Sequence, residues 1–338
     1  MSQRDGCGVL GGRRHHGRLL AIAVLLTTVI VLPATASAAR SAPRPDRDAS
    51  VKQIKLAAQA STTRYWTTQK MAAATPLDSS HNAAVATQTP TFASGPPPGT
   101  STAAPFDGVP TVGTFFFTDR KRNHSCSASV VKSPTRNIVL TAAHCAYTKK
   151  GGYKTNIVYV PGYHDGQRPY GTYAVKAITV AKGWKENADI SLDFAFMAVA
   201  PDPETGRRVQ DVTGGNRLGI NLGYDHTIEA IGYPSKTDRP VQCTTRSFAA
   251  PIPSQLQFNC NPFPGGTSGG PLLSHYDPDS GSGIVIGVIG GYQEGGSFDW
   301  TSYSPYFDEQ ILKLFIHAET DQLVPEANLT QWWLRRRT

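Results

Sequence analysis

The sequence predicts an all-β fold, either a barrel or a sandwich. From about residue 106 onward, short runs rich in β-branched and aromatic residues alternate with Gly, Pro, Asn and Asp. Many short strands separated by such turn residues are typical of these two architectures. The expected strands lie at residues 111–117, 126–131, 137–142, 156–160, 172–180, 193–199, 227–233, 256–260, 270–274 and 283–291.

Two connecting features accompany these strands. Residues 277–283, DPDSGSG, predict a hairpin loop rather than a calcium loop, because no ligand glutamate follows them. A helix is expected at the end of the domain, with Ser304 as its cap and Pro305 in its first turn. Its apolar stripe would consist of Phe307, Ile311, Leu314 and Phe315.

The amino terminus reads as a secretory signal peptide at residues 1–38. A basic segment at 13–18 precedes an apolar run at 19–32, and small residues follow. The apolar run is short for a membrane span, which makes an uncleaved anchor the less favoured alternative. We therefore expect cleavage after Ala36 or Ala38 and an extracellular protein that is not inserted in the membrane.

The remaining chain divides into three parts. Residues 39–105 contain an Ala-, Lys- and Gln-rich stretch and then a Pro-, Ser- and Thr-rich stretch, which predict a pro-region and a linker. A disordered spacer is the alternative for this part. Residues 106–320 form the expected folded domain, and residues 321–338 form a carboxy-terminal tail with the sequence QWWLRRRT at its end.

The charge distribution argues against a nucleic-acid partner. Residues 1–38, 39–105 and 106–338 carry net charges of +3, +4 and +1, which sum to the formal charge of +8. A nucleic-acid-binding protein concentrates positive charge on its folded domain. Here the expected domain is close to neutral.

The stretch GTSGG at residues 266–270 places a serine among glycines. The glycines allow a sharp turn that leaves the Ser268 hydroxyl uncrowded, and the amides of Gly266 and Ser268 can point at one oxyanion. A Gly/Ser turn without catalytic function is the alternative reading of the motif taken alone.

A serine nucleophile requires a base, and the base requires an acid that orients it. His144 follows an apolar strand and three small residues, and Asp193 directly precedes another strand, with Asp189 as the reserve candidate. The order His144, Asp193, Ser268 differs from that of α/β-hydrolases, in which the nucleophile comes first, and from that of subtilisin, in which the acid comes first.

Taken together, TAAHC (141–145), DFAF (193–196) and GGTSGGP (265–271) resemble a secreted bacterial, actinobacterial-type, trypsin-like serine protease of the chymotrypsin fold. The resemblance spans about residues 109–318. It implies two six-stranded antiparallel β-barrels with a carboxy-terminal helix. It also implies an endopeptidase that forms an acyl-enzyme, in which His144 is the base, Asp193 orients it and Ser268 attacks. The amides of Gly266 and Ser268 would form the oxyanion hole.

Four cysteines remain after the signal peptide, and an exported protein is expected to pair them. Three pairings are possible. Proximity in the sequence favours Cys126–Cys145 and Cys243–Cys260, and the resemblance supports the first of these.

The sequence departs from trypsin itself at two points. Thr267 stands where trypsin has an acid that pairs with a new amino terminus, and no Ile-Val-Gly-Gly start is present. The chain therefore resembles bacterial glutamyl-endopeptidase-like proteases more than trypsin itself, and we expect activity without that ion pair. A pro-region would act instead by covering the cleft or by assisting folding.

The substrate-binding residues inferred from the resemblance are Pro262, Phe263, Gly290 and Gly291. Because none of them is charged or carries an imidazole, a small or apolar residue is expected before the scissile bond. Protein or peptide substrates, a monomer, and no cofactor or metal are expected. A catalytically inactive protease-like binding module at the cell surface is the alternative function.

Overall fold

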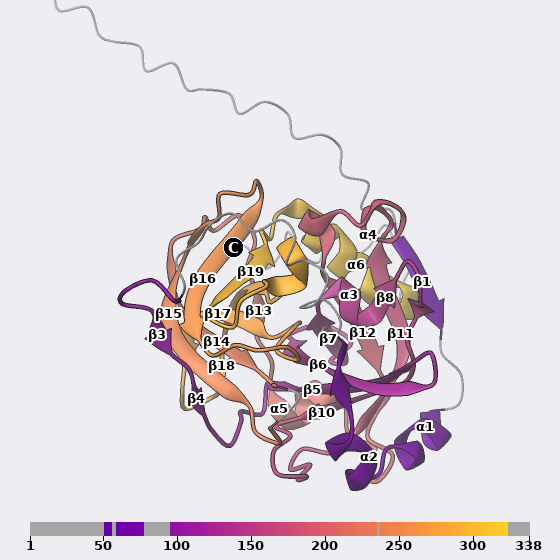
Figure 1. Cartoon of the computed structure of the whole chain (residues 1–338). Coiled ribbons are helices and arrows are strands. Elements are labelled where there is room, and N and C mark those ends of the chain that lie inside the picture. The colour runs from indigo at the N-terminus through magenta and orange to yellow at the C-terminus, as the bar shows by residue number, and fades with distance from the viewer. Residues whose placement is uncertain (1–50, 56–58, 78–94, 235–236, 324–338) are drawn as a thin grey trace, which may run out of the picture. The chain divides into compact units, whose positions relative to one another are not determined.

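The computed structural model describes residues 51–55, 59–77, 95–234 and 237–323. The expected signal peptide and residues 324–338 of the tail lie outside the described residues. Two sheets make up the folded domain (Figure 1), so the all-β expectation is confirmed.

The first sheet closes on itself as a six-stranded antiparallel barrel. Its strands run in the order β11-β10-β5-β6-β7-β12, and pairing of β11 with β12 closes the ring. Buried apolar side chains such as Phe115, Val139 and Met197 share one face around the ring and fill its interior. The strands are β5 (Val112–Asp119), β6 (Arg122–Val131), β7 (Ile138–Thr141), β10 (Thr155–Pro161), β11 (Tyr173–Ala181) and β12 (Ala195–Val199).

The second sheet has the order β13-β18-β17-β14-β15-β16-β19. β18 and β19 also approach each other, because the Val288 amide in β18 donates to Ser304 Oγ at 2.9 Å and the Gly290 amide just after β18 donates to Tyr303 O at 3.0 Å. The strands are β13 (Arg217–Leu218), β14 (His226–Gly232), β15 (Val241–Ala249), β16 (Gln255–Asn261), β17 (Pro271–Asp277), β18 (Ser282–Val288) and β19 (Thr301–Pro305).

Short elements connect the two sheets and extend them. β3 (Ser101–Thr102) and β4 (Ala104–Pro105) pair with β16 and β15, so the chain joins the second sheet before residue 106 (Figure 1). The remaining elements are α3 (Ala143–Ala146), β8 (Tyr147–Thr148), β9 (Gly152–Tyr153), α4 (Lys182–Asn187), η2 (Ile190–Leu192), α5 (Val209–Thr213) and η3 (Tyr292–Gly295).

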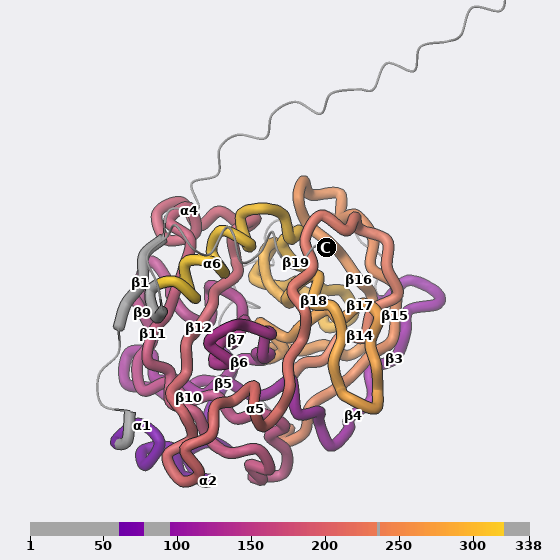
Figure 2. Tube along the Cα trace, turned by 180° about the vertical axis from the view of Figure 1, so that it is seen from behind, coloured from indigo at the N-terminus to yellow at the C-terminus, as the bar shows by residue number. Residues whose placement is uncertain are grey.

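The closing helix begins later than expected. α6 spans Glu309–Leu323, and Ser304 and Pro305 belong to β19 instead. Ser304 is buried and its hydroxyl bonds the sheet, whereas Asp308 accepts a hydrogen bond from the Gln310 amide at the start of the helix. The expected apolar stripe is buried, and α6 lies against β11 and β12 (Figure 2).

Among the longer strands of the second sheet, β15 and β19 lie outside the expected ranges. β15 has the sequence VQCTTRSFA and β19 has TSYSP, and neither carries the apolar pattern of a buried strand. Pairing with β14 and β16 supports these polar sequences as strands. The hairpin loop expected at residues 277–283 is confirmed, since β17 ends at Asp277 and β18 begins at Ser282.

Part of the expected pro-region packs on the closed barrel. β1 (Val51–Lys55) pairs with β11, and α1 (Gln59–Tyr65) and α2 (Thr68–Ala72) follow (Figure 1). β2 (Thr75–Pro76) then pairs with β6.

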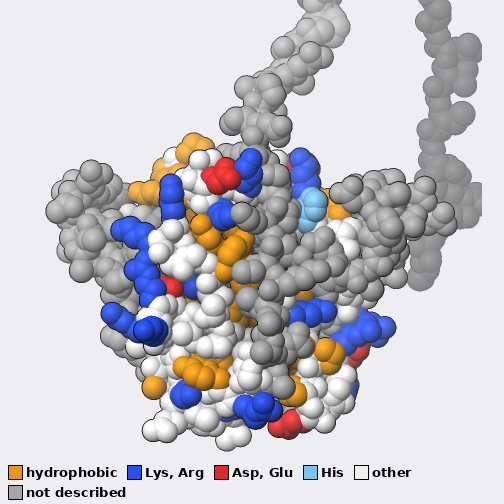
Figure 3. All heavy atoms as spheres, turned by 90° about the vertical axis from the view of Figure 1, so that its right-hand side faces the viewer, with side chains coloured by type: hydrophobic (Ala, Val, Ile, Leu, Met, Phe, Trp, Pro, Cys, Tyr) orange, Lys and Arg blue, Asp and Glu red, His pale blue; other side chains and the backbone are white. Residues whose placement is uncertain are grey.

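Basic side chains on the face that carries β1 and β11 are interspersed with apolar and uncharged ones (Figure 3).

Both expected disulfides form. Cys126–Cys145 joins β6 to α3, and Cys243–Cys260 joins β15 to β16. The two bridges span sequence separations of 19 and 17 residues, so each closes a short loop.

Candidate active site

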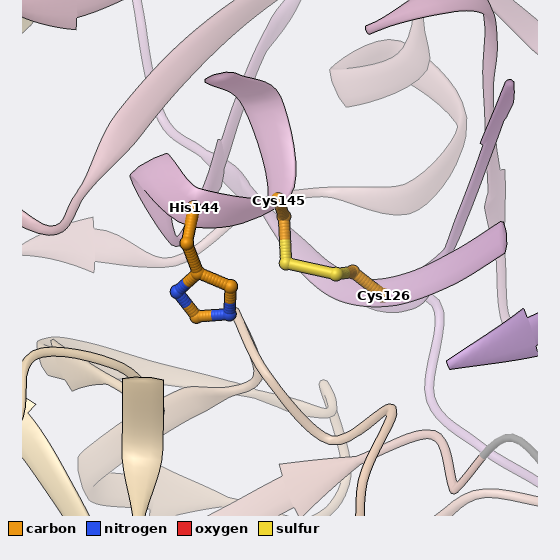
Figure 4. Close-up of side chains that lie close together, drawn as sticks. All are labelled: Cys126, His144 and Cys145. Carbon is orange, nitrogen blue, oxygen red and sulfur yellow. A yellow bond between two sulfur atoms is a disulfide. The ribbon is translucent and has the colours of Figure 1, made fainter. Parts of the chain in front are cut away.

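His144 lies on a short turn of helix at the end of a barrel strand. β7 ends at Thr141, and the small buried residues Ala142 and Ala143 lead into α3. The imidazole has no solvent-exposed surface. The disulfide of Cys145 fastens α3 to β6, and a nitrogen of the His144 ring lies within 4.8 Å of both sulfur atoms (Figure 4). Small neighbours and the disulfide together fix the position of the ring.

Asp193 is fully buried and accepts three hydrogen bonds. Its Oδ1 accepts from the His144 amide at 2.8 Å, and its Oδ2 bonds His144 Nδ1 at 2.8 Å. The Gly291 amide donates to the same Oδ2 at 2.7 Å. Burying a carboxylate is costly without such donors, so these bonds stabilise the charged form in the interior.

Asp189, the reserve candidate, has a different position. Its Oδ1 accepts from the Ser191 amide at 2.9 Å and begins the 3₁₀ turn η2. η2 in turn leads directly into Asp193. The structure thus brings Asp193 to His144 and gives Asp189 the role of a cap.

The serine loop lies against the end of β7. The Ser127 amide donates to Ser268 O at 2.7 Å, and the Gly269 amide donates to Ile289 O at 2.7 Å. Gly269 has a φ of +80°, and a Cβ there would collide with Thr141 Oγ1 and Ser127 O and would lie only 3.0 Å from the Ala142 nitrogen. The requirement for glycine thus follows from the close approach of this loop to the segment that leads into α3.

Thr267, which replaces the acid of trypsin, stabilises its own turn. Its Oγ1 donates to Pro264 O at 2.9 Å, and the Gly270 amide donates to Thr267 O at 2.9 Å. The side chain is 3% exposed. In this chain the Thr267 hydroxyl is bonded within its own loop. The acid that trypsin has at this place pairs instead with a new amino terminus.

Ser127 ties the serine loop to both sheets. Its hydroxyl donates to Gly266 O at 3.0 Å and accepts from the Tyr233 amide at 2.7 Å. This arrangement holds the peptide group that joins Gly266 to Thr267, directly after the Gly266 amide, which is one of the two expected oxyanion donors. The sequence analysis missed Ser127, because nothing in the motif CSASVV distinguishes this serine from its neighbours.

A loop of the second sheet covers Ser268. The Ser268 hydroxyl donates to Glu294 O at 3.4 Å, and Ser268 is 3% exposed. Gln293 and Glu294 both adopt left-handed backbone angles, with φ values of 52° and 54°. Non-glycine residues adopt these angles at some cost. The glycine-rich sequence GGYQEGG at residues 290–296 predicts an irregular turn, but it does not indicate which residues the turn contacts.

The four residues expected to bind substrate lie in different environments. Pro262 is exposed, whereas Phe263 is buried edge-on against Phe258, with ring centroids 5.6 Å apart. Gly290 bonds Tyr303 through its amide, and Gly291 bonds Asp193. A Cβ on Gly290 would lie 3.0 Å from Asp193 Oδ2, so glycine leaves room for the buried acid.

The described residues contain one group of side chains with the spacing of a metal site. It consists of Cys126, His144 and Cys145 (Figure 4). The two sulfur atoms are joined in a disulfide, whereas cysteine binds metals as the thiolate. This donor set does not fit a metal ion.

The model of the Trypsin family matches residues 99–303, which is more than half of the chain. The chain belongs to the trypsin family. The family domain begins at the short strands β3 and β4 and ends within β19, so it contains both sheets and the site described above. A trypsin-family serine peptidase is also what the three sequence motifs indicate, and that expectation is confirmed.

Solved structures of bacterial proteases share the fold. The protease Anisep from Arthrobacter nicotinovorans is 28% identical, with a TM-score of 0.58 over 64% of this chain and 99% of that one. The thermostable serine protease AL20 from an extremophilic microorganism is 25% identical, with a TM-score of 0.56 over 62% and 97%. A Glu endopeptidase, 18% identical with a TM-score of 0.50, covers 65% of this chain and 98% of that one and supports the fold alone.

A curated relative comes from Bacillus subtilis (strain 168). It is named an extracellular metalloprotease and is 27% identical over 165 residues, which are 46% of this chain and 49% of the relative. The chain thus matches about half the length of this relative. Within the residues that the structure describes, no helix is long and apolar enough to cross a membrane.

Proposed function

We propose that the protein is a secreted endopeptidase that cleaves peptide bonds through His144, Asp193 and Ser268. The observation that carries the proposal is the buried bond between Asp193 Oδ2 and His144 Nδ1, beside a serine loop packed on the same strand end. The chain's membership of the trypsin family supports peptidase chemistry. Family membership alone does not assign these three roles.

The hydrogen bonds of Asp193 set the tautomer of His144. An ionised carboxylate only accepts hydrogen bonds, so Nδ1 of the neutral imidazole carries the proton and Nε2 is the basic nitrogen. In the proposed mechanism Nε2 takes the proton of the Ser268 hydroxyl. Asp193 then stabilises the imidazolium, because its charge lies in a buried site where screening by water is weak.

The reaction proceeds through a covalent intermediate. Ser268 Oγ attacks the substrate carbonyl carbon, and the amides of Gly266 and Ser268 bond the oxyanion of the tetrahedral intermediate. His144 returns the proton to the leaving amine as the peptide C–N bond breaks. Water, activated by the same nitrogen, then hydrolyses the acyl-enzyme and releases Ser268.

We propose that this chemistry does not depend on an ion pair beside the nucleophile. Thr267 bonds Pro264 within the loop, and Ser127 bonds Gly266 from the other sheet. Both contacts come from residues already in place in the chain. Order at the serine loop therefore does not depend on a new amino terminus.

An apolar or small residue is proposed before the scissile bond. Phe263 lies two residues before Gly265, at the start of the serine loop. Its ring packs against Phe258 in the apolar core of the second sheet. Neither Phe263 nor the glycines at 290 and 291 offers a charge to an ionic substrate side chain. A peptide library would show this preference directly.

Inhibitor classes separate the proposed function from its alternatives. We expect the secreted protein to cleave casein, to lose activity with a serine-directed phosphonate, and to keep it with a metal chelator. Ser268→Ala should lower kcat/KM by a factor on the order of 10⁴ or more, as expected when a nucleophile is removed. Ser280→Ala, on the exposed hairpin loop, is the matched control.

Two outcomes would contradict the proposal. A folded protein without hydrolysis or labelling is the result expected of an inactive binding module. Loss of activity with the chelator, but not with the phosphonate, would instead indicate the chemistry named for the Bacillus relative.

A further inference from the structure

One edge of β6 leads directly to Ser268. β5 pairs with β6 over its whole length, whereas β7 pairs with it only from Ser129 to Val131. The amide of Ser127 donates to Ser268 O and its carbonyl accepts from Thr141 Oγ1, so both groups point away from β5. At Ser127 this edge already bonds the serine loop and Thr141, so the part of the outer edge of β6 that precedes Ser127 is the part left for a further strand.

Ser125 shares that outer edge. Residues two apart on a strand direct their main-chain groups to the same side, so the amide and carbonyl of Ser125 point the same way as those of Ser127. Ser125 lies about 6.7 Å from Ser127 along the strand. An extended peptide that pairs there would reach Ser268 within two residues.

The chain itself occupies this edge. β2 runs parallel to β6, with Thr75 opposite His124 and Pro76 opposite Ser125. The Thr75 hydroxyl lies 3.3 Å from His124 Nδ1, and Pro76 is buried. A peptide substrate lying along β6 and residues 75–77 cannot both pair with Ser125.

A tryptophan anchors this segment to the barrel. Trp66 is 1% exposed, packs against Phe116 with ring centroids 5.5 Å apart, and donates from Nε1 to Asn156 O. The neighbouring Tyr65 hydroxyl donates to Asn123 Oδ1 at 3.0 Å. Met71 is also buried, at 2% exposure. These contacts hold β2 at a high effective concentration beside the edge of β6.

From these contacts we infer that residues 59–77 are a built-in competitor of peptide substrates, anchored by Trp66 and occupying the β6 edge next to Ser268. The inference rests on the proposed function and adds to it the place and the residues of the inhibition. Recognition here is β-strand addition, in which main-chain hydrogen bonds supply the affinity. The inhibitor acts on substrates long enough to reach Ser125 and spares those that do not.

The test compares a long and a short substrate on the full chain. A quenched fluorescent peptide of about twelve residues is long enough to lie along the β6 edge. A chromogenic ester of a single amino acid is too short to pair with Ser125, which lies about 6.7 Å beyond Ser127 along the strand. Trp66→Ala should raise kcat/KM for the peptide about tenfold, because freeing one or two main-chain hydrogen bonds has that effect. The ester should respond less than about twofold by the same argument.

Matched variants and a peptide added in trans complete the design. Phe248→Ala removes an exposed aromatic from the other sheet and should leave the peptide-to-ester ratio unchanged. Met71→Ala is a milder change in the segment, should raise the ratio in the same direction, and serves if Trp66→Ala does not fold. A synthetic peptide of residues 59–77 should return the ratio of the Trp66→Ala variant to the wild-type value, and the same peptide with Trp66→Ala should not.

A folded Trp66→Ala or Met71→Ala protein with the wild-type ratio would overturn the inference, as would a synthetic peptide without effect. Either result would leave ester hydrolysis, and with it the proposed function, intact. Absence of ester hydrolysis in the wild type would contradict both.

Discussion

Asp193 shows how one residue connects burial to chemistry. Its carboxylate is fully buried and bonds the His144 amide, His144 Nδ1 and the Gly291 amide. The first two bonds fix the orientation of the histidine, and the third joins the acid to the second sheet. The sequence could indicate Asp193 because a charge before a buried strand is unusual. The Gly291 amide could not be predicted, because a main-chain donor is not encoded by a residue type.

Asp193→Asn tests this role. The substituted amide has the same shape but presents an NH₂ group, so it favours the wrong tautomer of His144. We expect kcat to fall by a factor on the order of 10⁴ with little change in KM. Asp189→Asn, at the cap of η2, is the control and should retain activity within about threefold, the cost of a modest hydrogen-bond change. Similar kinetics for both variants would argue against the assignment of the acid.

Among the elements, α6 shows where the sequence pattern was sufficient and where it was not. The apolar stripe predicted the helix and its buried face, because a period of 3.6 residues is a local signal. Its start was misplaced because Ser304 and Pro305 resemble a helix cap but are held in β19 by strand pairing. Whether Ser304 and Pro305 start a helix or extend a strand depends on pairing with β16, which is distant in the sequence.

α6 also carries a buried acid whose ionisation should affect stability. Glu319 is 2% exposed and accepts from the Thr135 amide and hydroxyl, yet burial raises the pKa of its carboxyl above the usual 4.5. The folded protein thus binds this proton more tightly than the unfolded chain does. The stabilisation is complete below about pH 4.5 and is lost as the pH rises through the higher folded pKa.

Glu319→Gln should remove this pH dependence. The glutamine keeps an oxygen acceptor for Thr135 but has no proton to release. We expect the difference in Tm between variant and wild type to shift in favour of the variant as the pH is raised from 4 to 7. Glu309→Gln, at the solvent-facing start of α6, is the control. A Tm difference that stays constant over this range would show that Glu319 does not titrate between the two states there.

At the scale of the whole molecule, the two sheets contribute different parts of the site. The closed barrel holds His144 and Asp193, and the second sheet supplies Ser268 and the loop at Glu294. The resemblance carried by the three short motifs implies a triad in the cleft between two barrels, and the assignment of the three residues stays a prediction; the motifs could be found because each is local and their order distinguishes hydrolase classes. The docking of residues 59–77 on β6 was not predicted, since its Ala-, Lys- and Gln-rich text gives no sign of the aromatic site that receives Trp66.

The most direct test of the central claim is to find where a serine-directed phosphonate attaches to the folded protein. The reagent should add once to the intact chain, and peptide mapping by mass spectrometry should place it on Ser268. Asp193→Asn should slow the labelling strongly, whereas Asp189→Asn should not. A label on another residue, or equal labelling of wild type and Asp193→Asn, would contradict the assignment of Ser268, His144 and Asp193 as one catalytic unit.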